Sequence, residues 1–210
     1  VVVLIDEYDK PILDNILEPE RAREVREGLK NLYSVLKDAD PHLHFVLLTG
    51  VSKFSKVSLF SGLNNLRDIT LSPDYTTICG YTDENIDTVF APELPGLDRE
   101  EIRQWYNGYR WGGREVESVY NPFDVLLLFQ EQEFGPYWFE SATPTFLVDI
   151  LKQRGVFTPS LDHWETEYEL LSQFDVDQIS TEGLLFQTGY LTIQQVEEPL
   201  LGYRQYTLGF

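Results

Sequence analysis

Residues 1–10, VVVLIDEYDK, decide the fold that the sequence predicts. Five consecutive apolar residues, most of them β-branched, predict a strand that is buried on both faces. Two adjacent carboxylates, Asp6 and Glu7, follow at the carboxyl end of this strand. Open α/β sheets bind their ligands at that edge. The stretch therefore predicts a parallel strand that delivers two acids to a functional site.

Adjacent acids in this position suit nucleotide hydrolysis. One carboxylate can hold a magnesium ion through water while the next orients the attacking water. We therefore interpret residues 1–7 as a Walker B strand, with Asp6 as the metal ligand and both Asp6 and Glu7 as catalytic residues. Such a strand works opposite a phosphate-binding loop. No GxxxxGK[S/T] segment occurs in the 210 residues.

A second buried strand is predicted over residues 42–49, HLHFVLLT. Between the strands, residues 18–37 predict a long helix, because their apolar side chains recur at spacings of three and four. A strand, a helix and a strand in this order form parallel strands with a right-handed crossover. Thr49 and Ser52 would then share an edge with Asp6, where a γ-phosphate sensor would lie. A capped loop after a strand explains the same pattern equally well.

The loop over residues 51–65 contains Lys53 in an otherwise acidic protein. It is a candidate for contact with phosphate or with a partner protein. The other predicted elements are a loop over 8–17, where Pro11 argues against a helix, a strand over 67–71, helices over 82–90, 98–106, 122–132, 144–154, 161–174 and 181–188, and hairpins over 105–120 and 190–208.

Two of these segments suggest a role. Three helices followed by a hairpin is the order of a winged helix, and the predicted helix over 181–188 has no Lys or Arg with which to read DNA. We therefore expect this winged helix to serve in packing. The aromatic cluster over 105–111 could stack a base, but we expect it to pack a small lid.

Composition excludes several classes of protein. A net charge of −19 disfavours autonomous binding to nucleic acid. No apolar run approaches the roughly 20 residues of a membrane span. The single Cys79 cannot form an internal disulfide, is expected to be buried, and together with the absence of zinc-site spacing favours a reducing cytoplasm. The sequence has no methionine, even at position 1, which suggests a fragment of a longer protein.

Several blocks of the sequence resemble the bacterial AAA-ATPase-like family, whose members typically precede a PD-(D/E)XK nuclease domain. The blocks run in order from residue 1 to residue 193. They are VVVLIDEYDKPILDN, FVLLTGVSKFSKVSLFSGLNNLRDITLSPDY, ICGYT, WYNGYRWGG, VYNPFDVLLLF, YWFESATPTFL and GLLFQTGYLTI.

The resemblance implies ATP and Mg²⁺ as cofactors. It makes Asp6 the Walker B carboxylate near the metal and Glu7 the carboxylate that orients water. The implied nucleotide-contacting residues are Thr49 or Ser52 as sensor, Lys53 beside them, and Arg110 as a lid arginine that faces phosphate. The family's phosphate loop and nuclease domain are both absent from these residues.

Together the residues and the resemblance predict an α/β fold. Residues 1–80 would form a partial parallel P-loop NTPase sheet of the ASCE/AAA-like type with flanking helices. Residues 81–140 would form a helical lid with a hairpin, and residues 141–210 a winged-helix-like subdomain.

The leading functional hypothesis is a fragment of an ATP-binding protein in which ATP turnover regulates a linked nuclease, the fragment itself being inactive. Its partners would be the upstream P-loop segment and the downstream nuclease domain of the same protein, with nucleic acid contacted only indirectly. A missing neighbouring strand would also leave an apolar edge that invites self-association.

Two alternatives remain open. The chain could be a non-catalytic regulatory scaffold with an ATPase-derived fold and a winged helix that docks partners. It could also be a metal-dependent nuclease that uses Asp6, Glu7, Asp9 and Lys10, although such enzymes usually place their acids on separate strands of a hairpin.

Overall fold

The computed structural model of the chain describes residues 1–51, 59–60, 66–112, 116–138, 145–155, 164–167, 171 and 180–209. These residues form a mixed α/β structure with small sheets. The chain divides into two compact units, unit 1 (Val1–Arg67 and Thr145–Leu191) and unit 2 (Asp68–Pro144 and Thr192–Phe210). The division into 1–80, 81–140 and 141–210 stays a prediction.

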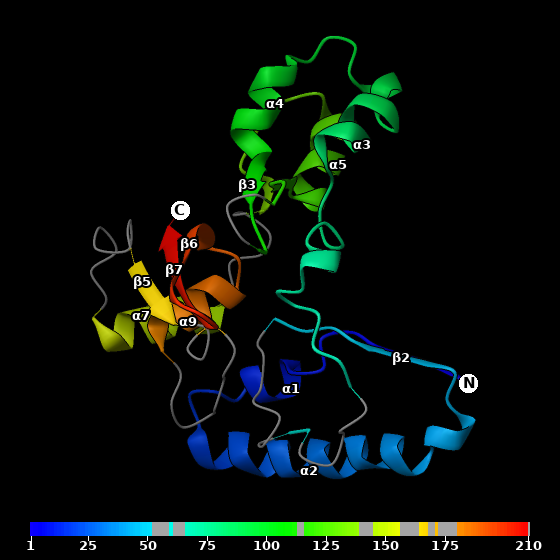
Figure 1. Cartoon of the computed structure of the whole chain (residues 1–210), viewed down its shortest axis with the longest axis vertical. Coiled ribbons are helices and arrows are strands. Elements are labelled where there is room, and N and C mark those ends of the chain that lie inside the picture. The colour runs from blue at the N-terminus through cyan, green and yellow to red at the C-terminus, as the bar shows by residue number, and fades with distance from the viewer. Residues whose placement is uncertain are drawn as a thin grey trace. The chain divides into compact units, whose positions relative to one another are not determined.

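Unit 1 contains the strand and helix predicted at the start of the chain (Figure 1). Its elements are β1 (Val2–Ile5), α1 (Lys10–Leu13), α2 (Pro19–Asp38), a 3₁₀ turn (Asp40–His42), β2 (Phe45–Leu48), α7 (Thr145–Arg154), β5 (Trp164–Glu167) and α9 (Thr181–Gln187).

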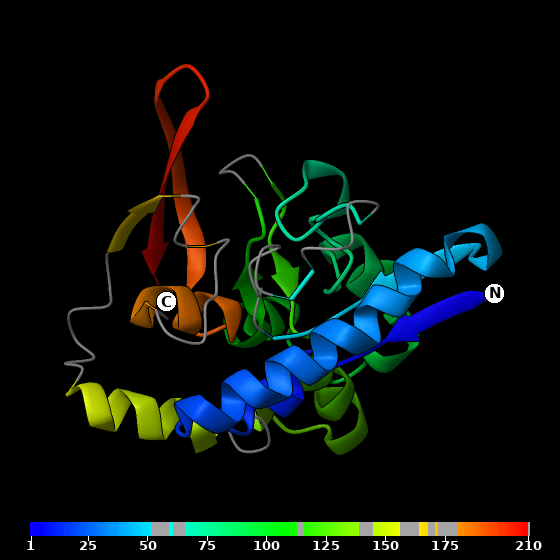
Figure 2. The same cartoon turned by 90° about the horizontal axis from the view of Figure 1, so that it is seen from below.

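Strands β1 and β2 pair in parallel, with Val2 opposite Phe45 and Ile5 opposite Leu48. Helix α2 connects them and lies alongside the pair in both views (Figures 1 and 2). The Tyr33 hydroxyl of α2 donates a hydrogen bond to the carbonyl of Tyr8, 3.1 Å away. The predicted strand, helix and parallel strand are therefore confirmed.

The prediction that the first strand is buried on both faces is wrong. Val2 and Leu4 are 55% and 67% exposed, whereas Val3 and Ile5 are half-buried. Alternate residues of a strand point to opposite faces, so one face of β1 is covered and the other is open. An apolar run predicts a strand, but it does not show which elements pack against the two faces of that strand. The extended P-loop sheet is likewise not seen among the described strands, where β1 pairs with β2 alone.

The structure differs from several other sequence predictions. The loop predicted over 8–17 is wrong at residues 10–13, which form helix α1. Pro11 is compatible with this helix because it stands in the first turn, where proline lacks only a donor that would be unpaired anyway. No strand forms at residues 67–71, which are irregular and turn. Part of the helix predicted over 161–174 is strand β5 instead. Cys79 is exposed, not buried.

Unit 2 contains helices α3, α4 and α5 and two hairpins (Figure 1). Its elements are a 3₁₀ turn (Pro73–Tyr75), α3 (Asp83–Thr88), a 3₁₀ turn (Ala91–Glu93), α4 (Arg99–Tyr106), β3 (Asn107–Tyr109), β4 (Val119–Tyr120), α5 (Pro122–Glu131), β6 (Thr192–Leu200) and β7 (Tyr203–Gly209). β3 pairs antiparallel with β4, and β6 pairs antiparallel with β7, as the two predicted hairpins require.

The helices of unit 2 begin where the sequence predicts, because their capping residues bind the first free N–H groups. Thr82 and Asn85 form a reciprocal capping box at α3. Asp98 accepts two N–H bonds at the start of α4, and Asn121 accepts two at the start of α5.

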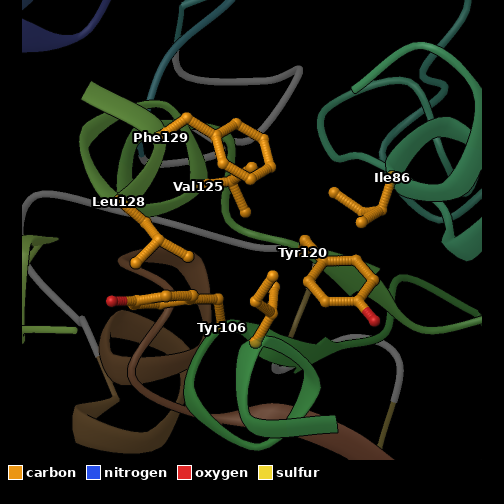
Figure 3. Packing of buried hydrophobic residues seen from close by; sticks show 7 residues of the cluster. Ile86, Tyr106, Tyr120, Val125, Leu128 and Phe129 are labelled. Carbon is orange, nitrogen blue, oxygen red and sulfur yellow. The ribbon is translucent and has the colours of Figure 1, made fainter. Parts of the chain in front are cut away.

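The core of unit 2 joins α3, α4, β4 and α5. Side chains from these elements point toward one another and are almost fully buried (Figure 3). They are Ile86, Ile102, Tyr106, Tyr120, Val125, Leu128 and Phe129. Tyr106 comes from the aromatic segment, and its place in this core agrees with the packing role expected for that segment.

The winged helix is not confirmed. Helix α9 and the β6–β7 hairpin follow one another as predicted, but β5 lies within the span expected to form the preceding helix.

None of the helices in the described part of the chain has the length and apolar character that a membrane span requires.

A charged network ties α3 to α4. The Arg99 guanidinium donates 2.6 Å bonds to Asp83, to Asp87 and to the Tyr120 hydroxyl. The Tyr120 hydroxyl in turn donates to Asp83, also at 2.6 Å. Burial opposes the charge on Asp83, but the bonds from Tyr120 and Arg99 prevail and lower the pKa of this carboxyl.

We expect Asp83→Asn to destabilise unit 2 by about 1 kcal/mol at pH 7. A lowered pKa stabilises the folded state above the unfolded value, near 3.9, and this stabilisation is lost as the pH falls through the folded pKa. The difference from the parent protein should therefore shrink below about pH 4. Urea unfolding followed by tryptophan fluorescence at several pH values measures it.

Asp87→Asn is the matched control, since Asp87 binds the same guanidinium but is 55% exposed in its side chain. Asp87→Asn should lower the free energy of unfolding by less than Asp83→Asn does. An equal cost for the two variants, or a cost for Asp83→Asn that does not change with pH, would contradict this account of the network.

Candidate functional site

Two polar residues meet at the carboxyl edge of the β1–β2 pair. Asp6 follows β1 directly and Thr49 follows β2, so the parallel register sets them side by side. The Thr49 hydroxyl donates a hydrogen bond to Asp6 Oδ1 at 2.5 Å. Both residues are exposed. The structure thus brings together a carboxylate and a hydroxyl from two adjacent strand ends.

Glu7 leaves the hydrogen-bond ladder immediately after Asp6. The Thr49 N–H donates to the Ile5 carbonyl, so regular parallel pairing would next place the Glu7 N–H on the Thr49 carbonyl. The Tyr8 N–H takes that place instead, at 3.0 Å. The Glu7 N–H donates to Asp6 Oδ1, also at 3.0 Å. Glu7 is therefore an extra residue, looped out as a bulge.

The backbone of Glu7 is left-handed, with φ of 52°. This conformation costs a non-glycine residue about 1–2 kcal/mol. Burial of the next two residues, Tyr8 and Asp9, anchors the chain on the far side of the bulge. Bulges often occur beside active sites, where they redirect a side chain. Here the bulge sets Glu7 on an exposed turn next to Asp6.

Asp9 lies beneath this turn and is 1% exposed. Its Oδ1 accepts a hydrogen bond from the Val51 N–H at 3.3 Å, and its carbonyl accepts the N–H groups of Ile12 and Leu13 at the start of α1. A Cβ atom on Gly50 would lie 2.5 Å from Asp9 Oδ1, so the close approach of the two turns requires glycine.

Three aromatic rings pack together next to this turn. Tyr8 and Tyr33 lie with their ring centroids 5.2 and 5.7 Å from that of Phe60. Burial raises the pKa of Tyr33, and the nearby charge of Asp9 raises it further. The tyrosine therefore stays protonated and keeps its hydrogen bond to the Tyr8 carbonyl.

The residues that carry this geometry match a family model described as predicted AAA-ATPase, over residues 1–60. This segment is therefore similar to the AAA-ATPase-like family, and the similarity suggests nucleotide binding in general. No solved structure matches the chain.

A relative from Azotobacter chroococcum mcd 1, described as an uncharacterized protein in the vnfD 5' region, is 66% identical over 197 residues. The match covers 94% of this chain and 38% of the relative. The chain therefore spans well under half of the length of this relative.

The AAA-ATPase-like resemblance also implies roles for Arg110, Ser52 and Lys53. Arg110 belongs to unit 2, where its backbone N–H donates to the Thr192 hydroxyl at 2.7 Å. Ser52 and Lys53 lie outside the described residues. Their roles stay predictions.

The sequence pattern did not indicate that Asp9 belongs to the candidate site, because spacing alone does not show which acid is buried. Asp9 was predicted only as an acid of the nuclease alternative. The sequence does contain a signal for this contact: the acid Asp9 comes soon after strand β1, and Gly50 comes soon after the neighbouring strand β2. Among the described residues, no group of three His, Cys, Asp or Glu side chains could hold a metal ion.

We expect Gly50→Ala to lower the free energy of unfolding by about 1–3 kcal/mol, because the new methyl group collides with Asp9 and Tyr8. Gly28→Ala is the control. Outside the neighbouring backbone of its own helix α2, no atom lies within 4 Å of a Cβ at Gly28, so Gly28→Ala should raise the free energy of unfolding by up to about 1 kcal/mol. Thermal unfolding of both variants checks the expectation, and a Gly50→Ala variant as stable as the parent would refute the close approach.

Substitutions at Glu7 test the left-handed bulge. Glycine adopts positive φ without the penalty that a Cβ brings, so Glu7→Gly should be more stable than Glu7→Ala by about 1 kcal/mol. Chemical denaturation of the two variants measures this difference. The opposite order, which is usual at an ordinary strand position, would show that Glu7 is not left-handed.

Proposed function

We propose that this chain supplies the Walker B and sensor half of an ATP-hydrolysing site. Asp6 would hold Mg²⁺ through water, Glu7 would orient the attacking water, and Thr49 would sense the γ-phosphate. The observation that carries the proposal is the exposed Asp6–Thr49 pair at the common edge of two parallel strands, inside the segment that matches the AAA-ATPase-like family.

The Asp6 carboxylate fits this role. Mg²⁺ keeps most of its water and needs only one or two protein carboxylates when phosphates complete its shell. Two donors, the Thr49 hydroxyl and the Glu7 N–H, converge on Asp6 Oδ1 and hold the carboxylate in one orientation. When bound, the metal would neutralise charge on the phosphates during transfer.

The phosphate-binding loop would come from sequence outside these 210 residues. The greater length of the Azotobacter relative supports this part of the proposal. In the complete site, Ser52, Lys53 and Arg110 would contact ATP, with residues 81–140 as a lid and residues 141–210 as a winged-helix-like subdomain. Through these parts, ATP turnover would regulate a linked nuclease in the cytoplasm.

A specific observation keeps the scaffold function as the second candidate. Val2, Leu4 and Phe45 expose more than half of their surfaces on the strand pair, and exposed apolar residues of this kind suit a partner interface.

The nuclease alternative has less support. Asp9 is buried against Val51, and the Lys10 ammonium lies 3.2 Å from Asp14, so these two residues do not join Asp6 in one exposed site.

The test is ATP hydrolysis by the protein that carries these residues together with the proposed phosphate loop. We expect Glu7→Gln to lower kcat by about 100- to 10,000-fold while ATP still binds, because the amide cannot act as a base toward water. Glu20→Gln, on the first turn of α2, is the control and should leave kcat unchanged.

Binding of ATP separates the two candidate functions. On the ATPase proposal, Mg²⁺-dependent ATP binding is present and Asp6→Ala abolishes it. If the parent protein binds no ATP, or if Asp6→Ala binds it as tightly as the parent, the scaffold function is the better description.

A further inference from the structure

We infer that Asp9 is a positioning residue that replaces a backbone acceptor lost at the Glu7 bulge and so holds the turn after β2 in line with β1. The effect of Asp9 on catalysis rests on the ATPase function proposed above. Its effect on the backbone does not.

The ladder shows which acceptor is lost. Regular parallel pairing that places the Thr49 N–H on the Ile5 carbonyl would place the Val51 N–H on the Glu7 carbonyl. The bulge turns that carbonyl away, and it accepts the Lys10 N–H at 3.0 Å instead. Asp9 Oδ1 accepts from Val51 in its place. A side chain thus continues the pairing by one further bond after the backbone has diverged.

Burial shows that the Asp9 carboxylate has a specific place in the fold. A carboxylate that is 1% exposed is unfavourable unless hydrogen bonds compensate its lost hydration. Bonds from N–H groups to a charged acceptor are stronger than bonds to a carbonyl. The absence of a side chain at Gly50 allows the approach, since a Cβ there would lie 2.5 Å from Asp9 Oδ1.

The hydrogen bond from the Val51 N–H to Asp9 Oδ1, called the tether below, also affects the position of Thr49. Its carbonyl accepts the Tyr8 N–H, and two residues later the Val51 N–H is held by Asp9, so the turn after β2 is fixed on both sides of Gly50. Loss of the Asp9 acceptor would free this turn and let the Thr49 hydroxyl shift from Asp6. Displacements of about 1 Å in a catalytic arrangement can cost up to about 100-fold in rate.

Three variants of the ATPase-competent protein test the inference. Asp9→Asn keeps an acceptor at Oδ1, Asp9→Leu keeps the volume without an acceptor, and Ile12→Val loosens the same buried turn without touching the tether. We expect Asp9→Leu to lower kcat by about 10- to 100-fold with the KM for ATP within about threefold of the parent. Asp9→Asn and Ile12→Val should stay close to the parent.

Equal losses of kcat in Asp9→Leu and Asp9→Asn would overturn the inference, because the acceptor would then not matter. So would a loss in Ile12→Val as large as that in Asp9→Leu, since general loosening would explain both. If Asp9→Leu does not fold, Asp9→Ser, whose shorter side chain cannot reach Val51, takes its place in the same comparison.

Hydrogen exchange separates this inference from the proposed function. The Val51 amide should exchange at least about tenfold faster in Asp9→Leu than in the parent, while Asp9→Asn protects it. This result is expected even if the protein does not hydrolyse ATP, in which case only the proposed function fails. Unchanged exchange at Val51 would refute the tether whatever the ATPase activity.

Discussion

The parallel pairing of β1 with β2 is the interaction on which the candidate site depends. It joins residues 43 positions apart in the chain, and its register alone sets Asp6 next to Thr49. Helix α2 provides the crossover, and the buried Tyr33 links that helix to the turn after β1. A different register would place other residues at the edge, so the chemistry of the site is fixed by backbone hydrogen bonds.

The strand pair and the turn that follows it impose different demands on the chain. The ladder favours an extended backbone, whereas helix α1 begins only three residues after Glu7. The left-handed bulge at Glu7 resolves this difference, and the Asp9 carboxylate supplies the acceptor that the bulge removes. The same device leaves one acid exposed beside Asp6 and buries another beneath it.

The sequence predicted those parts of the fold that depend on local patterns. Apolar spacing located α2, and Thr82, Asp98 and Asn121 located the starts of three helices because each binds free N–H groups nearby. Burial and long-range pairing were less accessible. The open face of β1 depends on what packs against it, and the tether from Asp9 to Val51 joins residues 42 positions apart. That Asp6 and Thr49 share one edge was predictable, because both parallel strands end there, whereas their adjacency depends on the register.

On the proposed function, the Asp6–Thr49 edge is one half of a nucleotide site. Its most direct test is a crystal structure of the protein that includes the proposed phosphate loop, with Mg²⁺ and a non-hydrolysable ATP analogue. We expect a metal-bound water on the Asp6 carboxylate and the γ-phosphate facing the Thr49 hydroxyl. A nucleotide bound away from the carboxyl edge of β1 and β2 would contradict it.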